Sequence, residues 1–131
     1  RPGVRLLLDT HAFVWWLDGN RRLSVRARRA IGDARNAVSV SAVSAFELVT
    51  KARLGRLPEA RDVTDDVAAA IRGQGFVPLD LTVAHAQRAG DLPFAHPDPF
   101  DRLLAAQAQA EGLRFVSNDE AFDRLGVARF W

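Results

Sequence analysis

The stretch Arg5-Leu6-Leu7-Leu8-Asp9 decides the fold class that this sequence predicts. A short, continuous apolar run without polar alternation is typical of a strand that is buried on both faces of a parallel sheet. Asp9 ends the run, and a carboxylate at the tip of a buried strand is costly unless something binds it. The stretch therefore predicts a strand of an α/β sheet with a polar site at its carboxyl end.

Strands and helices alternate on the C-terminal side of this stretch. Further strands are expected at 37–40, 76–79, 114–117 and 128–130, and helices at 10–17, 24–33, 41–54, 64–73, 82–89, 99–112 and 120–125. Ser24, Ser41, Thr64 and Thr82 are the expected helix caps, Pro78 favours an edge strand, and the prolines at 93, 97 and 99 predict a loop. The alternation predicts an α/β fold: a mainly parallel sheet of about four to five strands, covered on both faces.

Length and composition favour one domain over residues 1–131, because 131 residues with 48% hydrophobic and 26% charged content suit one core. The absence of cysteine excludes disulfides, Cys-ligated zinc and thiol catalysis. No apolar run approaches the roughly 20 residues of a membrane span, and the start Arg1-Pro2-Gly3-Val4 lacks the pattern of a secretory signal. A cytoplasmic protein is expected. The net charge of +2, with Lys51 as the one lysine, does not by itself indicate a nucleic-acid partner.

Acidic residues stand at the edges of the expected elements. Each of them alone reads as a helix cap or as an acid in a first helical turn. Ser44-Ala45-Phe46-Glu47 even matches a capping box, although a helix that starts at Ser41 leaves its acid inside the helix. Together, several acids in one small domain repel one another, and a divalent cation with a preference for oxygen ligands relieves that repulsion. The predicted metal site consists of Asp9, Glu47, Asp101 and Asp119, with Asp98 as a possible fifth ligand.

Four segments resemble the PIN-domain ribonucleases and, more narrowly, the VapC toxins of type II toxin–antitoxin systems. The resemblance runs nearly end to end, and the Asp-Pro-Phe-Asp-Arg motif is its most specific part. The segments are Leu7-Leu8-Asp9-Thr10-His11-Ala12, Ser44-Ala45-Phe46-Glu47-Leu48, His96-Pro97-Asp98-Pro99-Phe100-Asp101-Arg102 and Val116-Ser117-Asn118-Asp119.

The resemblance implies a PIN-like three-layer α/β/α sandwich and assigns roles to single residues. Asp9, Glu47, Asp101 and Asp119 match the catalytic acids that hold Mg²⁺ or Mn²⁺, and Asp98 matches a common extra acid. Thr10 and Ser117 match hydroxyl positions that support the acids or a metal-bound water. The implied reaction is cleavage of single-stranded RNA by metal-activated water, leaving a 5′ phosphate. The implied partners are a second copy of the chain and a VapB-type antitoxin, through which alone operator DNA would be bound.

Two further residues are candidate contacts with substrate or partner. Arg102 follows an acid of the motif, so it is expected to pair with an acid or to touch phosphate. Trp15 and Trp16 are adjacent, and a helix cannot bury both on one stripe. One is expected in the core, and the other is free to contact RNA or a partner, with Trp15 as the candidate. His11 is not needed as a base because metal-activated water requires none, and its spacing to His85 and His96 does not suit zinc.

Alternatives of three kinds remain open: another enzyme class on a similar sheet, a non-catalytic binding module, and a PIN ribonuclease without an antitoxin. A phosphotransfer domain would use Asp9 or Asp119 as acceptor and a lysine near a later strand end, but Lys51 lies in the helix after the second strand. A phosphatase would want a second Asp where His11 stands. The acids of a non-catalytic binding module would only cap helices, and a PIN ribonuclease of RNA processing would have no antitoxin. Composition and spacing lead only to an acidic metal site, whereas RNA and toxin rest on the resemblance.

Overall fold

The computed structural model describes residues 3–93 and 96–131. Its sheet holds five parallel strands in the order β3-β2-β1-β4-β5, which confirms the mainly parallel sheet. β1 is the central strand, with Leu8 opposite Val40 on one side and Val116 on the other. The strands are β1 (Arg5–Leu8), β2 (Ala37–Ser41), β3 (Val77–Leu79), β4 (Arg114–Val116) and β5 (Arg129–Phe130).

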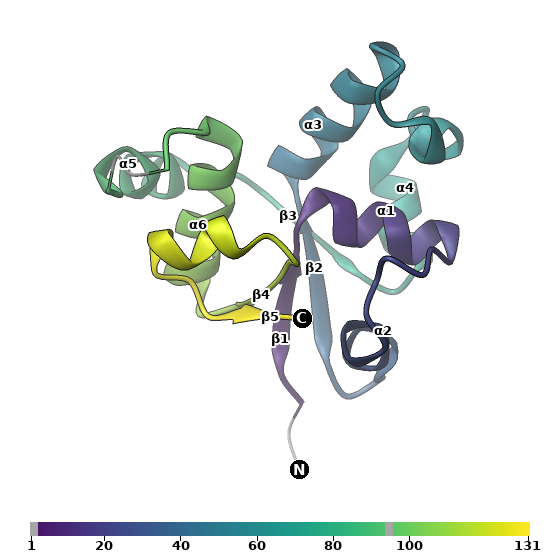
Figure 1. The fold of residues 1–131 in the computed structure, drawn as a ribbon, viewed down its shortest axis with the longest axis horizontal. Helices are drawn as coiled ribbons and strands as arrows, with labels where there is room; N and C mark the ends of the chain where they lie inside the picture. Colours follow the sequence, from purple (N-terminus) through teal and green to yellow (C-terminus); the bar gives the residue numbers. More distant parts are fainter. Residues whose placement is uncertain (1–2, 94–95) are drawn as a thin grey trace.

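Helices cover both faces of this sheet, so the three-layer architecture is confirmed (Figure 1). α1, α2 and α4 lie on one side of the sheet, and α5, α6 and η2 lie on the other. α3 projects beyond the carboxyl end of β2, where it contacts both α1 and α6. The helices are α1 (Thr10–Asp18), α2 (Val25–Gly32), α3 (Ala42–Arg53), α4 (Val67–Gly73), α5 (Val83–Asp91) and α6 (Pro99–Glu111), with the 3₁₀ helices η1 (Pro58–Val63) and η2 (Glu120–Leu125).

The apolar run of β1 explains why this strand lies at the centre of the sheet. Leu6 and Leu8 point into the core under α1, where they pack with Phe13. Leu7 points into the second core with Phe115. All three leucines are at most 2% exposed, and burying each of them stabilises the fold by about 1.5–3 kcal/mol. A strand with two buried faces needs apolar residues at consecutive positions, as the sequence has.

Most of the expected helix starts are confirmed. Ser24, Ser41 and Thr82 each accept a backbone N–H of the first turn of the helix that follows. The start at Ser41 leaves Glu47 inside α3, so the capping-box interpretation of Ser44 is wrong. The Ser44 hydroxyl is buried and lies 2.9 Å from the Thr10 hydroxyl.

The expected cap at Thr64 is wrong. The chain from Pro58 to Val63 forms the unpredicted η1, and Thr64 follows it with helical backbone angles. Asp66 caps α4 instead, because its φ of −152° is extended and its carboxylate accepts the Ala69 N–H at 2.9 Å. A cap needs this extended backbone, which Thr64 lacks.

Parts of three sequence predictions fall outside the described residues. They are the first two residues of the start at 1–4, residues 94 and 95 of the loop predicted from 93 to 99, and the same four residues of the single domain predicted over 1–131. In the parts that are described, no helix combines the length and the apolar character that a bilayer crossing requires. The single-domain organisation stays a prediction.

Candidate active site

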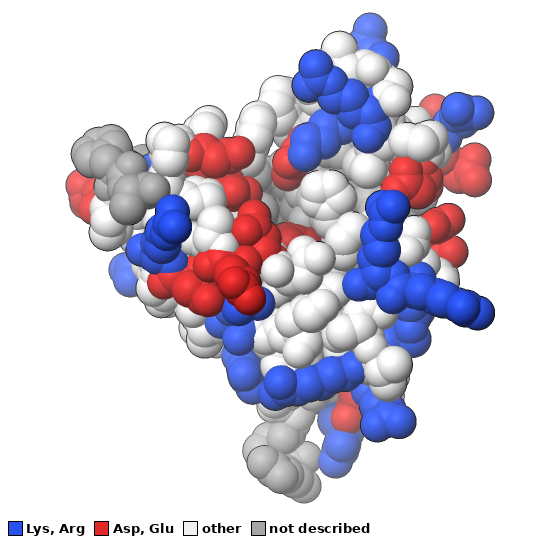
Figure 2. Space-filling view, viewed as in Figure 1, with Lys and Arg blue, Asp and Glu red and all other residues white. Residues whose placement is uncertain are grey.

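A pocket of about 440 Å³ lies beyond the carboxyl ends of β1 and β4. Ligand sites in parallel α/β sheets form at this edge. Figure 2 shows acidic side chains gathered around a hollow in this face, with basic side chains farther out. All five acids singled out in the sequence line the pocket: Asp9, Glu47, Asp98, Asp101 and Asp119, together with Thr10, His11, Trp15, Lys51, Leu104, Asn118 and Phe122.

Asp9 forms the floor of the pocket. It follows β1 directly and caps α1, accepting the Ala12 N–H at 2.7 Å. Only 8% of the residue is exposed. Burial raises the pKa of the Asp9 carboxyl to about 6, and the nearby charges of Glu47 and Asp101 raise it further, while hydrogen bonds from Ser117 and Ala12 oppose them. A positive charge near Asp9 would therefore stabilise its ionised form.

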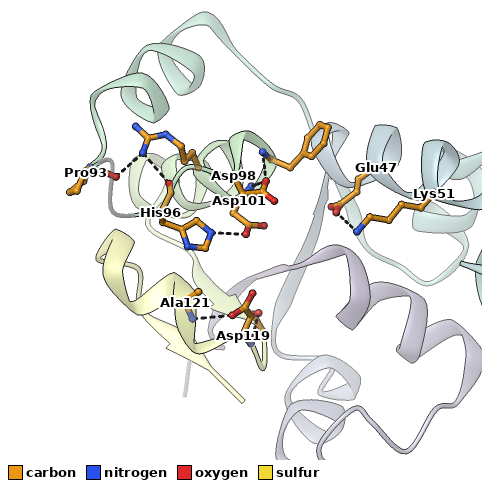
Figure 3. Close-up of polar contacts among 11 residues, drawn as sticks. Glu47, Lys51, Pro93, His96, Asp98, Asp101, Asp119 and Ala121 are labelled. Atoms are coloured by element: carbon orange, nitrogen blue, oxygen red, sulfur yellow. Dashed lines mark hydrogen bonds and ion pairs between the residues drawn. The ribbon is translucent and has the colours of Figure 1, made fainter. Parts of the chain in front are cut away.

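Glu47 reaches the pocket from the middle of α3 and has a partner on each carboxylate oxygen. Thr10 Oγ1 donates to Glu47 Oε1 at 2.7 Å. Lys51, one turn later on the same helix, places its Nζ 2.7 Å from Glu47 Oε2 (Figure 3). Thr10 thus holds the glutamate in place, and Ser44 lies on the other side of the Thr10 hydroxyl.

Asp101 enters from the first turn of α6. His96 Nε2 lies 2.7 Å from Asp101 Oδ2, and both side chains are largely buried (Figure 3). Burial raises the pKa of the Asp101 carboxyl, His96 opposes this, and the charges of Asp98 and Glu47 add to the rise. Asp98 caps α6 with one oxygen, which accepts the N–H groups of Phe100 and Asp101 at 2.9 and 3.2 Å.

Asp119 stands at the outer rim of the pocket. Its Oδ1 accepts the Ala121 N–H at 2.9 Å and caps η2 (Figure 3). Its own N–H donates to the Ser117 hydroxyl at 3.1 Å. Ser117 is fully buried and also bonds to Asp9, so it links the acids at the ends of β1 and β4.

The types of oxygen atom that line the pocket suit a hard divalent cation. Carboxylate and hydroxyl oxygens predominate, and the raised pKa of Asp9 indicates a position where positive charge would be stabilising. In residues 3–93 and 96–131, however, no three His, Asp or Glu side chains are gathered closely enough to hold one metal ion. The carboxylates of Glu47 and Asp101 instead bond to Lys51 and His96, respectively. These basic partners reduce the repulsion between the two acids.

The buried side chain of Arg102 contacts the main chain of this protein and offers little surface for the predicted contact with substrate or partner. It is 7% exposed, and its guanidinium donates to the backbone carbonyls of Ala89, Gly90, Leu92, Pro93 and His96. Five donors in a fixed fork suit such a cluster of carbonyl groups. Arg102 thus fastens the end of α5 and the following loop to α6, and sequence reasoning missed this role because the partners are main-chain atoms.

Trp15 is the core member of the tryptophan pair. It is 7% exposed, and its ring lies 6.0 Å from that of Trp131 and 5.5 Å from that of His11. Trp16 is half-buried, and its Nε1 donates to Gln74 at 3.0 Å. Trp15 reaches the pocket only as part of its wall, which leaves little of its surface for the predicted contact.

Replacing Thr10 with valine should loosen Glu47. Valine keeps the shape of threonine but removes the hydroxyl between Glu47 and Ser44, and leaving buried polar groups without a partner costs about 1–3 kcal/mol. We expect urea unfolding to show a loss of stability in this range for Thr10→Val and only a small loss for Thr10→Ser, which keeps the hydroxyl. Equal losses in both variants would mean that the methyl group, not the hydrogen bond, matters.

The fold and the pocket together define an α/β protein with an acidic site at the carboxyl edge of its sheet. A model of the PIN domain matches residues 6–128. Ribonuclease VapC22 of Mycobacterium tuberculosis (strain ATCC 25618 / H37Rv) is 36% identical over 118 residues, which cover 87% of this chain and 86% of that protein. The chain belongs to the PIN-domain family, among the VapC ribonucleases.

Two further comparisons agree with this assignment. The tRNA(fMet)-specific endonuclease VapC of Shigella flexneri is 27% identical over 138 residues, covering 96% of each chain. A chain in the crystal structure of VapBC2 from Rickettsia felis bound to a DNA fragment from their promoter superposes with a TM-score of 0.72 at 16% identity, covering 97% of this chain and 98% of that one. This last likeness shows the PIN fold.

Proposed function

We propose that this chain is a divalent-metal-dependent endoribonuclease toxin that cleaves single-stranded regions of RNA and is inhibited by a cognate antitoxin. One observation carries the proposal: acids from four separate segments of a PIN domain line a single pocket. Two relatives that span most of the chain are named as a ribonuclease and an endonuclease. Helix capping alone would not require these acids to line the same pocket.

Asp9, Glu47, Asp101 and Asp119 would hold Mg²⁺ or Mn²⁺, with Asp98 beside them. A bound divalent cation supplies charge neutralisation at the phosphate and lowers the pKa of water. The remaining residues orient this set: Thr10 holds Glu47, and Ser117 bonds to Asp9. Burial and the charge of Lys51 lower the pKa of His11, so at neutral pH this ring is uncharged and adds no competing cation.

The same relatives support a proposal for the partners. We propose a VapB-type antitoxin as inhibitor, a homodimer as the state of the toxin, contact with operator DNA only through the antitoxin, and a cytoplasmic location. The relative from Rickettsia felis was solved as VapBC2 with a promoter DNA fragment. A short reading frame for a DNA-binding protein next to the gene would support the toxin, and its absence would favour a PIN ribonuclease of RNA processing.

The test compares cleavage with and without metal. The purified chain is incubated with a mixture of structured RNAs in Mg²⁺ or Mn²⁺ and then in chelator, alongside Asp9→Ala and Asp101→Ala. We expect cleavage in single-stranded regions, 5′-phosphate ends, and loss of both in chelator and in either variant. Cleavage that persists in chelator or in both variants would contradict the metal mechanism.

A non-catalytic binding module is the second candidate, and one observation favours it. Asp9, Asp98 and Asp119 do cap helices, so capping explains part of the pattern. It does not explain Glu47, which lies inside α3, or Asp101, which bonds to His96. Absence of RNA cleavage by the wild type under every metal condition would favour this candidate.

A further inference from the structure

Lys51 is the one Lys or Arg among the described residues that line the acidic pocket. It is also the one lysine of the whole chain, in which every other strongly basic residue is arginine. Its position on α3, four residues after Glu47, directs both side chains to the same side of the helix. Figure 3 shows the two side chains side by side at the edge of the pocket.

The side chain of Lys51 is partly exposed as well as paired. The side chain is 34% exposed, whereas that of Glu47 is 13% exposed. An ammonium carries three donors, and the bond to Glu47 uses one of them. In a partly buried ion pair the attraction between the charges is largely offset by their desolvation, so stability alone gives a weak reason for a cation here.

The charge of the pocket gives a stronger reason. Five carboxylates line it against one ammonium, and such a site repels the phosphates of a nucleic acid. A cation held by the acids offsets part of this charge. Among the described residues that line the pocket, Lys51 is the one side chain that can meet an entering phosphate with a fixed positive charge.

We propose that Lys51 binds a phosphate of the RNA at the cleavage site, with Glu47 holding its ammonium in place. This inference rests on the proposed function and adds a substrate-contacting residue to it. Lys51 suits the task because a compact ammonium on a flexible stem can bond to Glu47 and to a phosphate oxygen at the same time. The interaction depends on charge and needs no transfer of the lysine proton.

The competing explanation is that Lys51 only orients Glu47. The two roles differ in what they change. An orienting lysine would affect how tightly the acids hold a metal, whereas a phosphate-binding lysine would affect RNA. A contact with one phosphate of single-stranded RNA also contributes about 0.7 to the slope of log affinity against log salt concentration.

The test uses Lys51→Met, Lys51→Arg and, as matched control, Arg53→Met. Arg53 lies in the same last turn of α3, is exposed and lies outside the pocket. For each variant, Mn²⁺ affinity is measured by titration, and kcat/KM is measured with the RNA that the wild type cleaves. Binding of short random-sequence single-stranded RNA is measured at several salt concentrations with a constant concentration of Ca²⁺ in place of Mn²⁺, so that the acids hold a cation. Circular dichroism checks the fold, and Lys51→Gln replaces Lys51→Met if methionine impairs folding.

We expect Lys51→Met to lower kcat/KM by about 10- to 100-fold, the range of one charge-assisted contact. The salt slope should fall by about 0.7, with Mn²⁺ affinity undiminished. Lys51→Arg should restore much of the activity and Arg53→Met should match the wild type. A loss no larger than that of Arg53→Met, or a parallel loss of Mn²⁺ affinity, would overturn the inference. Absence of cleavage by the wild type would instead overturn the proposed function.

Discussion

Asp9→Asn should make the chain inactive and more stable at the same time. Asparagine keeps the oxygen that accepts the Ala12 N–H but removes the charge that a metal requires. Metal ions supply several kcal/mol of charge stabilisation in the transition state, so we expect RNA cleavage to fall by about 1000-fold or more. Mn²⁺ affinity should fall with it, because the other acids cannot replace a ligand on the pocket floor.

The gain in stability follows from the raised pKa of Asp9. The carboxyl has a pKa of about 6 in the folded chain against 3.8 as its ordinary value, and each tenfold difference in proton affinity is worth about 1.4 kcal/mol. Below pH 3.8 the group is neutral in both states and costs nothing. Between pH 3.8 and about 6 the unfolded chain releases this proton while the folded chain keeps it, so the wild type without metal progressively loses stability. Above about pH 6 the folded chain carries the buried charge, and the loss reaches its full value of up to about 3 kcal/mol.

Urea unfolding of the metal-free chain at several pH values checks this expectation. Asp9→Asn should exceed the wild type by up to about 3 kcal/mol at pH 7, and the difference should shrink towards pH 4. Asp62→Asn, a change at an exposed position of η1, serves as the control and should follow the wild type throughout. A variant that is less stable than the wild type at pH 7 would mean that Asp9 serves the fold and not a site.

The sequence predicted the sheet well because the signal for each strand is local. Leu6, Leu7 and Leu8 are apolar without alternation, which only a strand with two buried faces requires, and Pro78 belongs at an edge. The failure at Thr64 is also local. Thr64 and Asp66 are both good caps in isolation, and the choice between them depends on where η1 ends. η1 packs Ala60 into the core, a tertiary contact that the local sequence pattern does not reveal.

In the pocket, too, contacts that follow from regular secondary structure could be predicted from the sequence, and the other contacts could not. That Asp9 and Asp119 would share an edge followed from parallel strands, and the pair of Glu47 and Lys51 has the four-residue spacing that a helix brings together. The contact between His96 and Asp101 was not predictable in this way, because a proline-containing loop separates them and no periodic structure fixes their distance. The same holds for Arg102, whose partners are carbonyl groups that every residue has.

Arg102→Met should be among the most destabilising substitutions in this chain. Methionine can fill the space of the aliphatic stem, so the packing changes little, but five carbonyls of the α5 end and its loop lose their donor. Each buried carbonyl left without a partner costs about 1–3 kcal/mol, and water can reach some of them. We expect a loss of about 3 kcal/mol or more in urea unfolding.

Arg102→Lys should restore little of this stability. An ammonium has three donors at one point, whereas the guanidinium spans carbonyls as far apart in sequence as Ala89 and His96. Arg88→Met is the matched control, because Arg88 lies on α5, is exposed and donates to a single side chain. It should cost well under 1 kcal/mol. A small loss in Arg102→Met, or full recovery in Arg102→Lys, would show that the carbonyls find other donors.

The effect of Arg102 should extend to the acids, because the loop that it fastens carries His96. His96 bonds to Asp101, and Asp101 precedes Arg102 on α6, so the three residues close a small ring of contacts. Releasing the loop removes the neighbour that orients Asp101, and loss of such a partner typically lowers metal affinity by about 10- to 100-fold. Mn²⁺ titration at a temperature where Arg102→Met is still folded measures this. His96→Ala should reproduce the loss of affinity with little of the loss of stability, which separates the orientation of the acid from the anchoring of the loop.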